Sequence, residues 1–269
     1  RVRRNDYHSL ARFRQVIDRR RASAQLSLLG HEPLEQRQLL AVSAVSSGNV
    51  GNGTGLLTIS LNAANDQAFL RVLGNTMQVS TTSDFLTPVL GNGANGINFS
   101  TASGYAGVTV IDNAAGGGLG QNFTLRQTTF ALPATLTTTG IEDVSLNSAI
   151  NNAVTVDATN LVVNAAIGSA GKSINLNANS SLSLLSSVTG SNITLNSSTI
   201  STSATLTASS LLTATSPGVI AFEGAATAGG DVSVTSSGGN IVVNQSLTST
   251  TGNVILWSDQ NDVLINNGV

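Results

Sequence analysis

The feature that most constrains the fold of this chain is a short repeated unit in its C-terminal half. In each unit, Asn or Asp is followed by an apolar residue, any residue and a second apolar residue. The clearest copies lie at 231–234, 240–243, 253–256 and 262–265. The first and third copies begin 22 residues apart, and so do the second and fourth. This step suits one coil of a parallel β-helix, and looser copies with slightly shorter steps begin at Val154, Ile174 and Ile193.

The alternation within each unit explains why such coils would stack. In an extended strand, the two apolar positions point to the same side. Stacked coils would join them into ladders of Val, Ile and Leu inside a cylinder, with each coil pairing its edge with the next. The sequence therefore predicts an all-β fold, a parallel β-helix (β-solenoid) over 141–269. Since the last unit reaches almost to Val269, we expect a longer array cut at this point. The side chains expected inside are Val232, Val234, Ile241, Val243, Val254, Leu256, Val263 and Ile265.

The same register leaves four apolar side chains outside. Ile255 and Trp257 alternate with inward positions, and the 22-residue step places Val242 beside Leu264. A solitary rod would favour Ser or Thr at such positions. We predict that these four residues form a candidate lateral interface for self-association or for another segment. The alternative is that a neighbouring loop or further coils cover them.

Residues 48–140 have a different character. Short apolar runs alternate there with turns rich in Gly and Asn, and the segment holds five of the seven Phe. Large aromatic side chains suit a segment that covers the open end of a stacked core. We expect irregular β structure, either as capping rungs of the solenoid or as a small β domain in front of it.

The segment 1–47 forms a basic leader. Residues 1–40 contain nine Arg against four acidic residues, and residues 5–21 show helical spacing of Leu10, Phe13, Val16 and Ile17 among several Arg. This pattern predicts a short basic helix. It fits a membrane-surface or export segment, a solvated basic helix, or translated upstream sequence outside the mature protein.

A specific motif follows in this leader. It comprises Leu34, Glu35, Arg37, Leu39 and Leu40, with small residues at 41–44 that could form a cleavage site. These residues resemble the LEPR-XLL motif of very large surface proteins of planctomycete-type bacteria, although Gln36 stands where that family has Pro. The resemblance covers only a small part of the chain, and it implies a sorting signal, export machinery as partner and a location at the cell surface or outside the cell. The alternative is an amphipathic turn that docks on the first rung.

The repeats carry a second resemblance. The stretch at 229–244, which reads Gly-Gly-Asp-Val-Ser-Val followed later by Gly-Gly-Asn-Ile-Val-Val, is similar to filamentous-haemagglutinin and autotransporter-type adhesins. This likeness extends over roughly 140–269 and rests on composition and period. It implies a structural or adhesive role, with a polysaccharide, a protein or another copy of the chain as partner.

Composition excludes several other partners. After residue 40 only Arg71, Arg126 and Lys172 oppose ten acidic residues, so the body has a net charge of −7 and lacks a basic stripe for nucleic acid. No run of 18 apolar residues occurs, so we expect no transmembrane helix. The absence of Cys removes disulfides and thiolate metal sites and leaves the compartment open.

Chemistry-bearing residues are sparse. His8 and His31 both lie in the leader, so the body has no imidazole to act as a base or ligand. The carboxylates of the body are scattered, and Asp231 and Asp262 occupy strand starts where a turn residue is expected. The sequence therefore predicts a chain that is not an enzyme. The alternative is the N-terminal part of a carbohydrate-active β-helix whose paired carboxylates lie beyond residue 269.

The sequence also offers one candidate for calcium. Residues 117–122 read Gly-Gly-Leu-Gly-Gln-Asn, similar to the nonapeptide of calcium-binding β-rolls. The unit occurs once, and Asn122 stands where a carboxylate is needed. We expect a Gly-rich turn, with no metal and no cofactor.

Overall fold

The computed structural model describes residues 42–85, 98–100, 104–114 and 120–267 of the chain. Apart from one 3-10 turn, η1 (Val50–Asn52), the elements in these ranges are β-strands. The strands are β1 (Val42–Ser47), β2 (Gly55–Leu61), β3 (Gln67–Leu73), β4 (Thr76–Ser80), β5 (Asn98–Ser100), β6 (Tyr105–Asp112), β7 (Asn122–Leu125), β8 (Thr135–Leu146), β9 (Val154–Val163), β10 (Ile174–Leu184), β11 (Val188–Thr202), β12 (Leu206–Ser216), β13 (Ile220–Phe222), β14 (Ala226–Ala228), β15 (Val232–Ser236), β16 (Ile241–Val243), β17 (Leu247–Ser249), β18 (Val254–Ser258) and β19 (Val263–Ile265).

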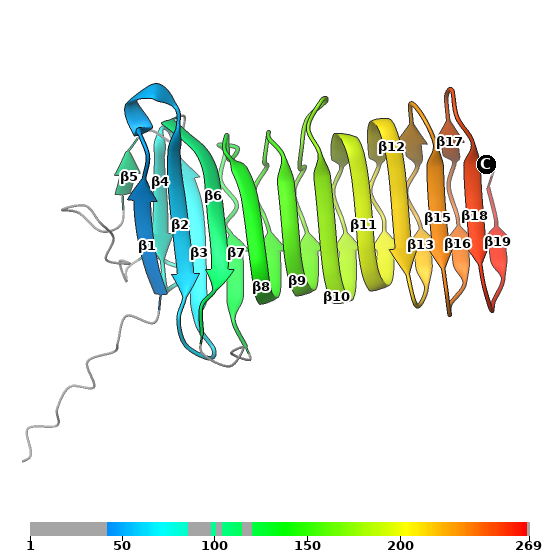
Figure 1. The fold of residues 1–269 in the computed structure, drawn as a ribbon, viewed down its shortest axis with the longest axis horizontal. Coiled ribbons are helices and arrows are strands. Elements are labelled where there is room, and N and C mark those ends of the chain that lie inside the picture. The colour runs from blue at the N-terminus through cyan, green and yellow to red at the C-terminus, as the bar shows by residue number, and fades with distance from the viewer. Residues whose placement is uncertain (1–41, 86–97, 101–103, 115–119, 268–269) are drawn as a thin grey trace, which may run out of the picture. The chain divides into compact units, whose positions relative to one another are not determined.

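These strands wind into a β-solenoid of about seven turns, which confirms the predicted fold class (Figure 1). On the near side in Figure 1, the front sheet is formed by parallel pairing of β2, β6, β8, β9, β10, β11, β12, β15 and β18 in that order. The back sheet pairs β3 and β7 with the second halves of β8 to β11 and then with β13, β16 and β19. A narrow third ladder runs through the starts of β11 and β12 to β14 and β17.

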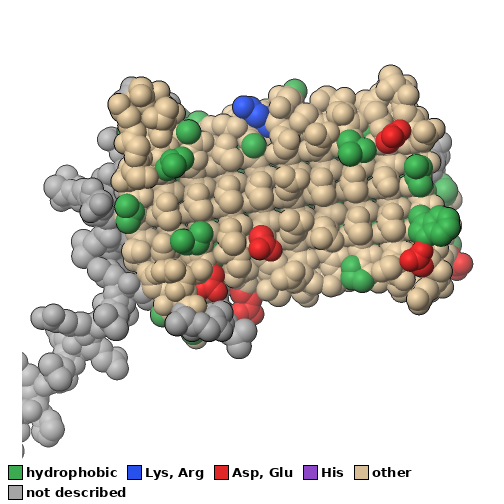
Figure 2. Space-filling view, in the orientation of Figure 1, with side chains coloured by type: hydrophobic (Ala, Val, Ile, Leu, Met, Phe, Trp, Pro, Cys, Tyr) green, Lys and Arg blue, Asp and Glu red, His purple; other side chains and the backbone are tan. Residues whose placement is uncertain are grey.

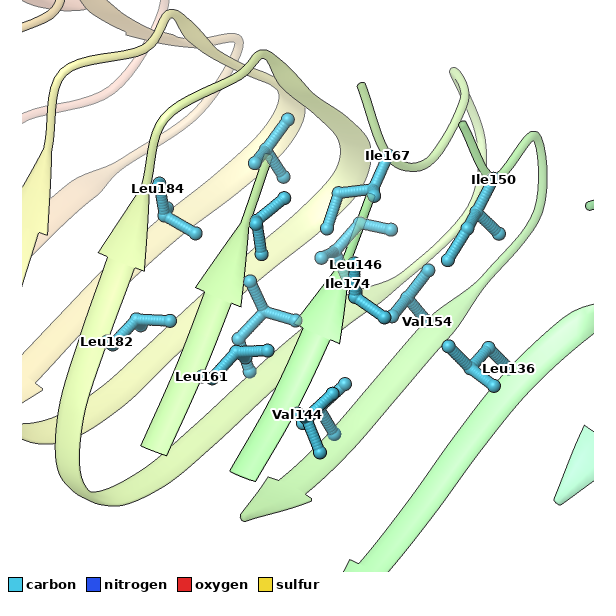
Figure 3. Close-up of a cluster of buried hydrophobic side chains, with 14 of the residues drawn as sticks. Leu136, Val144, Leu146, Ile150, Val154, Leu161, Ile167, Ile174, Leu182 and Leu184 are labelled. Atoms are coloured by element: carbon cyan, nitrogen blue, oxygen red, sulfur yellow. The ribbon is translucent and has the colours of Figure 1, made fainter. Parts of the chain in front are cut away.

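The core lies between these sheets and consists of aliphatic ladders, to which each coil contributes at the same positions (Figure 3). In the front sheet one inward ladder runs through Leu136, Val154, Ile174, Ile193, Leu212 and Val232. All of these side chains are fully buried. The alternating burial of each strand follows from the alternation in sequence, because successive side chains of an extended strand point to opposite faces. In-register stacking then brings like side chains together along the axis.

Tight bends between strands require glycine at particular places. Gly168 has a φ of 80°, and a Cβ atom added there would lie 2.1 Å from the carbonyl oxygen of Thr189 on the next coil. Both the left-handed backbone and the close approach therefore exclude larger residues at this bend.

The side chains predicted to face the interior of the C-terminal coils lie in the expected register, but not all of them are fully buried. Val232, Val234, Ile241 and Val243 are fully buried, and Val254 and Leu256 pack against the core from partly buried positions. Val263 and Ile265 align with Ile241 and Val243 as expected but are 37% and 50% exposed. The reason is that no described strand pairs with the outer edge of β19, so one side of these two side chains stays open.

At the N-terminal end, antiparallel strands lie against the first coil. β1 pairs with β2 and β4 pairs with β3 in antiparallel directions, and β5 pairs antiparallel with β4. Such pairing occupies the hydrogen-bonding edges that a stack of parallel strands would otherwise expose. The parallel ladders continue across residue 140, because β8 pairs with both β6 and β9. The division into segments 1–47, 48–140 and 141–269 stays a prediction.

Helices long and apolar enough to cross a bilayer do not occur in the described ranges. The predicted basic helix at 5–21 lies outside these ranges.

Candidate functional site

Several of the scattered carboxylates accept hydrogen bonds from a neighbouring coil. The Asp231 carboxylate accepts a 2.8 Å hydrogen bond from the backbone N–H of Asn253, one coil further along. Side-chain amides donate in the same way elsewhere: Asn160 to Asp143 at 2.9 Å and Asn244 to Glu223 at 2.7 Å. Each of these carboxylates thus links two neighbouring coils.

No metal site emerges from the residues that the structure describes. They contain no group of three or more His, Cys, Asp or Glu side chains that could hold an ion. Of the candidate calcium turn, 120–122 is described and 117–119 is not. Gly120 has a φ of 83°, and its backbone N–H donates a hydrogen bond to the Glu142 carboxylate. The Glu142 carboxylate thus already accepts a hydrogen bond from the backbone of this turn. The Gln121 side chain is fully buried.

The four residues of the predicted lateral interface all point outward, but they lie on two different sheets. Val242 and Leu264 are direct neighbours on β16 and β19 of the back sheet, as the 22-residue step requires. Ile255 and Trp257 lie on β18 of the front sheet. Ile255, Trp257 and Leu264 are 50%, 60% and 43% exposed, and Val242 is half-buried. The set therefore divides into two pairs, and its role as an interface stays a prediction.

A shallow concavity of about 340 Å³ lies where the back sheet ends on one side. Its lining residues are Arg126, Gln127, Asn147, Asn164 and Ala165. Within it, the Asn164 amide donates a 2.7 Å hydrogen bond to the Asn147 side chain, which links two coils. The exposed guanidinium of Arg126 is the single cation of this lining and would hold a small anion weakly, because water screens it.

The outward face of the front sheet is the most regular surface in the described part of the chain. Between the inward positions of the front sheet, one outward position carries a small polar side chain on every strand from β2 to β15, and Ile255 occupies it on β18. We call this row of small polar side chains the first rank, and it consists of Thr58, Thr109, Thr137, Thr155, Asn175, Thr194, Thr213 and Ser233. All eight side chains are half-buried. Figure 2 views the molecule from the side of the front sheet, where most of the surface is neither apolar nor charged and rows run along the solenoid.

A second rank lies two residues further along five of these strands, β9 to β12 and β15, whereas Ile111 occupies this position on β6. It consists of Asp157, Asn177, Asn196, Thr215 and Thr235. No side chain of either rank makes a hydrogen bond to any described residue, whereas many Ser, Thr and Asn at the coil bends bond to the next coil. Together the two ranks form what we call the front array. Its signal in the sequence is the Thr between two apolar residues, as at Thr155, Thr194 and Thr213.

The corresponding outward positions of the back sheet show no such regularity. They carry, in coil order, Phe69, Thr124, Ser145, Val162, Ser183, Ser201, Ala221, Val242 and Leu264. The uniform polar character of the front array is therefore not a general property of the outside of this solenoid.

The sorting motif at Leu34, Glu35, Arg37, Leu39 and Leu40 lies outside the described residues. Comparisons of the chain with family models, with curated proteins and with solved structures give no match.

Proposed function

We propose that this chain is a non-catalytic structural and adhesive segment of a large exported bacterial surface protein. The observation that carries the proposal is the continuous solenoid, in which coil after coil repeats the same inward ladder over about seven turns. A stack of this kind gains length by adding coils, without requiring a new core. It suits a rod that holds binding surfaces away from a cell.

The placement of charged groups supports the same proposal. Asp143, Glu223 and Asp231 engage neighbouring coils and so contribute to the stack. A glycosidase-type site would instead need two carboxylates within reach of one glycosidic bond. Between β9 and β15 the exterior of the front sheet carries mostly small polar side chains and few charges, as expected for a surface that contacts its surroundings over a wide area.

The proposed export rests on the leader, whose motif resembles a sorting signal. We expect the double variant Arg37→Ala with Leu39→Ala to leave the solenoid folded and to remove it from the cell surface. The measurement is antibody labelling of intact cells of the native host, with circular dichroism of the purified variant as the test of folding. The matched control is Gln38→Ala, since the motif accepts any residue at that position. Undiminished surface labelling of the double variant would refute the sorting role.

The sequence of the gene beyond Val269 tests the structural role. Further coils built on the same Asn-apolar-x-apolar unit are the expected result. A stretch with His, Arg and closely paired acidic residues would instead favour the carbohydrate-active enzyme.

A further inference from the structure

We propose that the front array is an ice-binding surface, which holds a layer of water in the arrangement of an ice face. The inference goes beyond the structural and adhesive role and does not depend on export. It rests on the spacing, the stiffness and the unsatisfied hydrogen-bonding groups of the two ranks.

The spacing of the array follows from β-sheet geometry. Neighbouring parallel strands lie about 4.8 Å apart, and two residues along a strand span about 6.6 Å. Each strand of the front sheet from β2 to β15 contributes one residue to the first rank, and each of these residues is paired in register with the next. The front array is therefore a two-dimensional grid where both ranks are present, on β9 to β12 and β15. Its repeat across the strands is close to the shorter oxygen–oxygen repeat on the prism faces of hexagonal ice.

The side chains of the grid hold these positions firmly. Six of the eight members of the first rank are Thr, whose branched Cβ restricts χ1, and all eight are half-buried between their neighbours. Water bound to such side chains would be placed at the strand spacing with little further loss of side-chain entropy. A surface of Lys, Glu or Gln would lose far more freedom on forming the same contacts.

The hydrogen-bonding capacity of the grid is directed outward. Each Thr hydroxyl of the first rank can donate one hydrogen bond and accept others, and none is used within the described part of the chain. Hydroxyls held in fixed positions favour an ordered water layer over the disordered shell of a charged surface.

The shape and charge of the array favour ice over other partners. Neither rank contains a cation that could hold a phosphate, and Asp157 is the single charged member. Sugar-binding sites are concave, whereas the front array follows a sheet and has no aromatic side chain within its ranks. Trp257 stands only at the end of the second rank, on β18. A grid of outward hydroxyl and amide groups along a sheet fits a partner that has a lattice of its own.

The test is the behaviour of single ice crystals in a solution of the purified 269-residue chain. The expected result for the unaltered chain is faceted crystals and a gap between melting and freezing temperatures. Thr194→Tyr places a large ring in the middle of the first rank, and we expect it to abolish the gap. Thr155→Tyr, two coils away, should do the same. The matched control is Ser201→Tyr, because Ser201 lies on the same strand, β11, and points outward from the back sheet.

Circular dichroism establishes that all three variants keep the solenoid, as expected for outward positions. Round crystals and no temperature gap with the unaltered chain would overturn the proposal. It would equally be overturned if folded Thr194→Tyr and Thr155→Tyr kept the full gap, or if folded Ser201→Tyr lost it as completely as they did.

Discussion

Replacing Leu176 by Ala probes the stacked core at its centre. Leu176 is fully buried and lies between Val156 on β9 and Leu195 on β11 in one inward ladder of the front sheet. Removing its isobutyl group loses burial and leaves a cavity, and buried Leu→Ala changes cost about 2–5 kcal/mol. The strands on either side are held about 4.8 Å apart by their hydrogen bonds, so they cannot close the cavity. We therefore expect a loss of about 4 kcal/mol, in the upper part of that range.

The assay is urea unfolding of the chain followed by circular dichroism, together with thermal melting. A loss of this size corresponds to a melting temperature lower by roughly 10 °C for a domain of this length. Asn175→Ala is the matched control, because Asn175 is the adjacent residue and points outward in the first rank. Such surface changes stay within about 0.5 kcal/mol. The reasoning fails if Leu176→Ala destabilises the chain no more than Asn175→Ala.

Two further predictions concern positions at which the repeat departs from its rule. Thr202 is a fully buried hydroxyl in the back-sheet ladder, and its Oγ1 atom has no hydrogen-bond partner among the described residues. Thr202→Val should therefore raise the free energy of unfolding by about 1 kcal/mol, and an unchanged or lower urea midpoint would contradict this. The variant Val242→Thr with Leu264→Thr removes the outward apolar pair of the back sheet. Sedimentation should show weaker self-association without unfolding, and equally monomeric parent and variant would exclude an interface there.

The local rule of the fold could be predicted from the sequence. Two apolar residues separated by one other residue define an inward pair, and the step at which these pairs recur defines the coil. This reasoning alone places Val232 and Val234 correctly, and it also predicts the stacking of Val242 on Leu264. Backbone geometry makes successive side chains of a strand point to opposite faces, so this alternation does not depend on the length of the coil.

The surfaces could not be predicted to the same extent. Ile255 and Val242 both alternate with inward residues, but the bends at 244–246 and 250–253, on either side of β17, place them on different sheets. The alternation does not record the angles of these bends. The first rank cannot be recognised from the sequence alone, because the number of residues between its successive members varies from coil to coil. The stretch of chain from Thr109 to Thr137, for example, is much longer than the stretch from Thr137 to Thr155. Only the register of strand pairing shows that they share one row.

The most direct test of the in-register stack is a set of distances between paired spin labels, since the chain contains no Cys of its own. Labels at Thr137 and Thr213 lie four coil steps apart in the first rank, and labels at Thr137 and Ile255 lie six steps apart. At about 4.8 Å per step, the account predicts narrow distributions centred near about 19 Å and about 29 Å. Broad distributions, or a second distance no longer than the first, would contradict the solenoid and the register on which the front array depends.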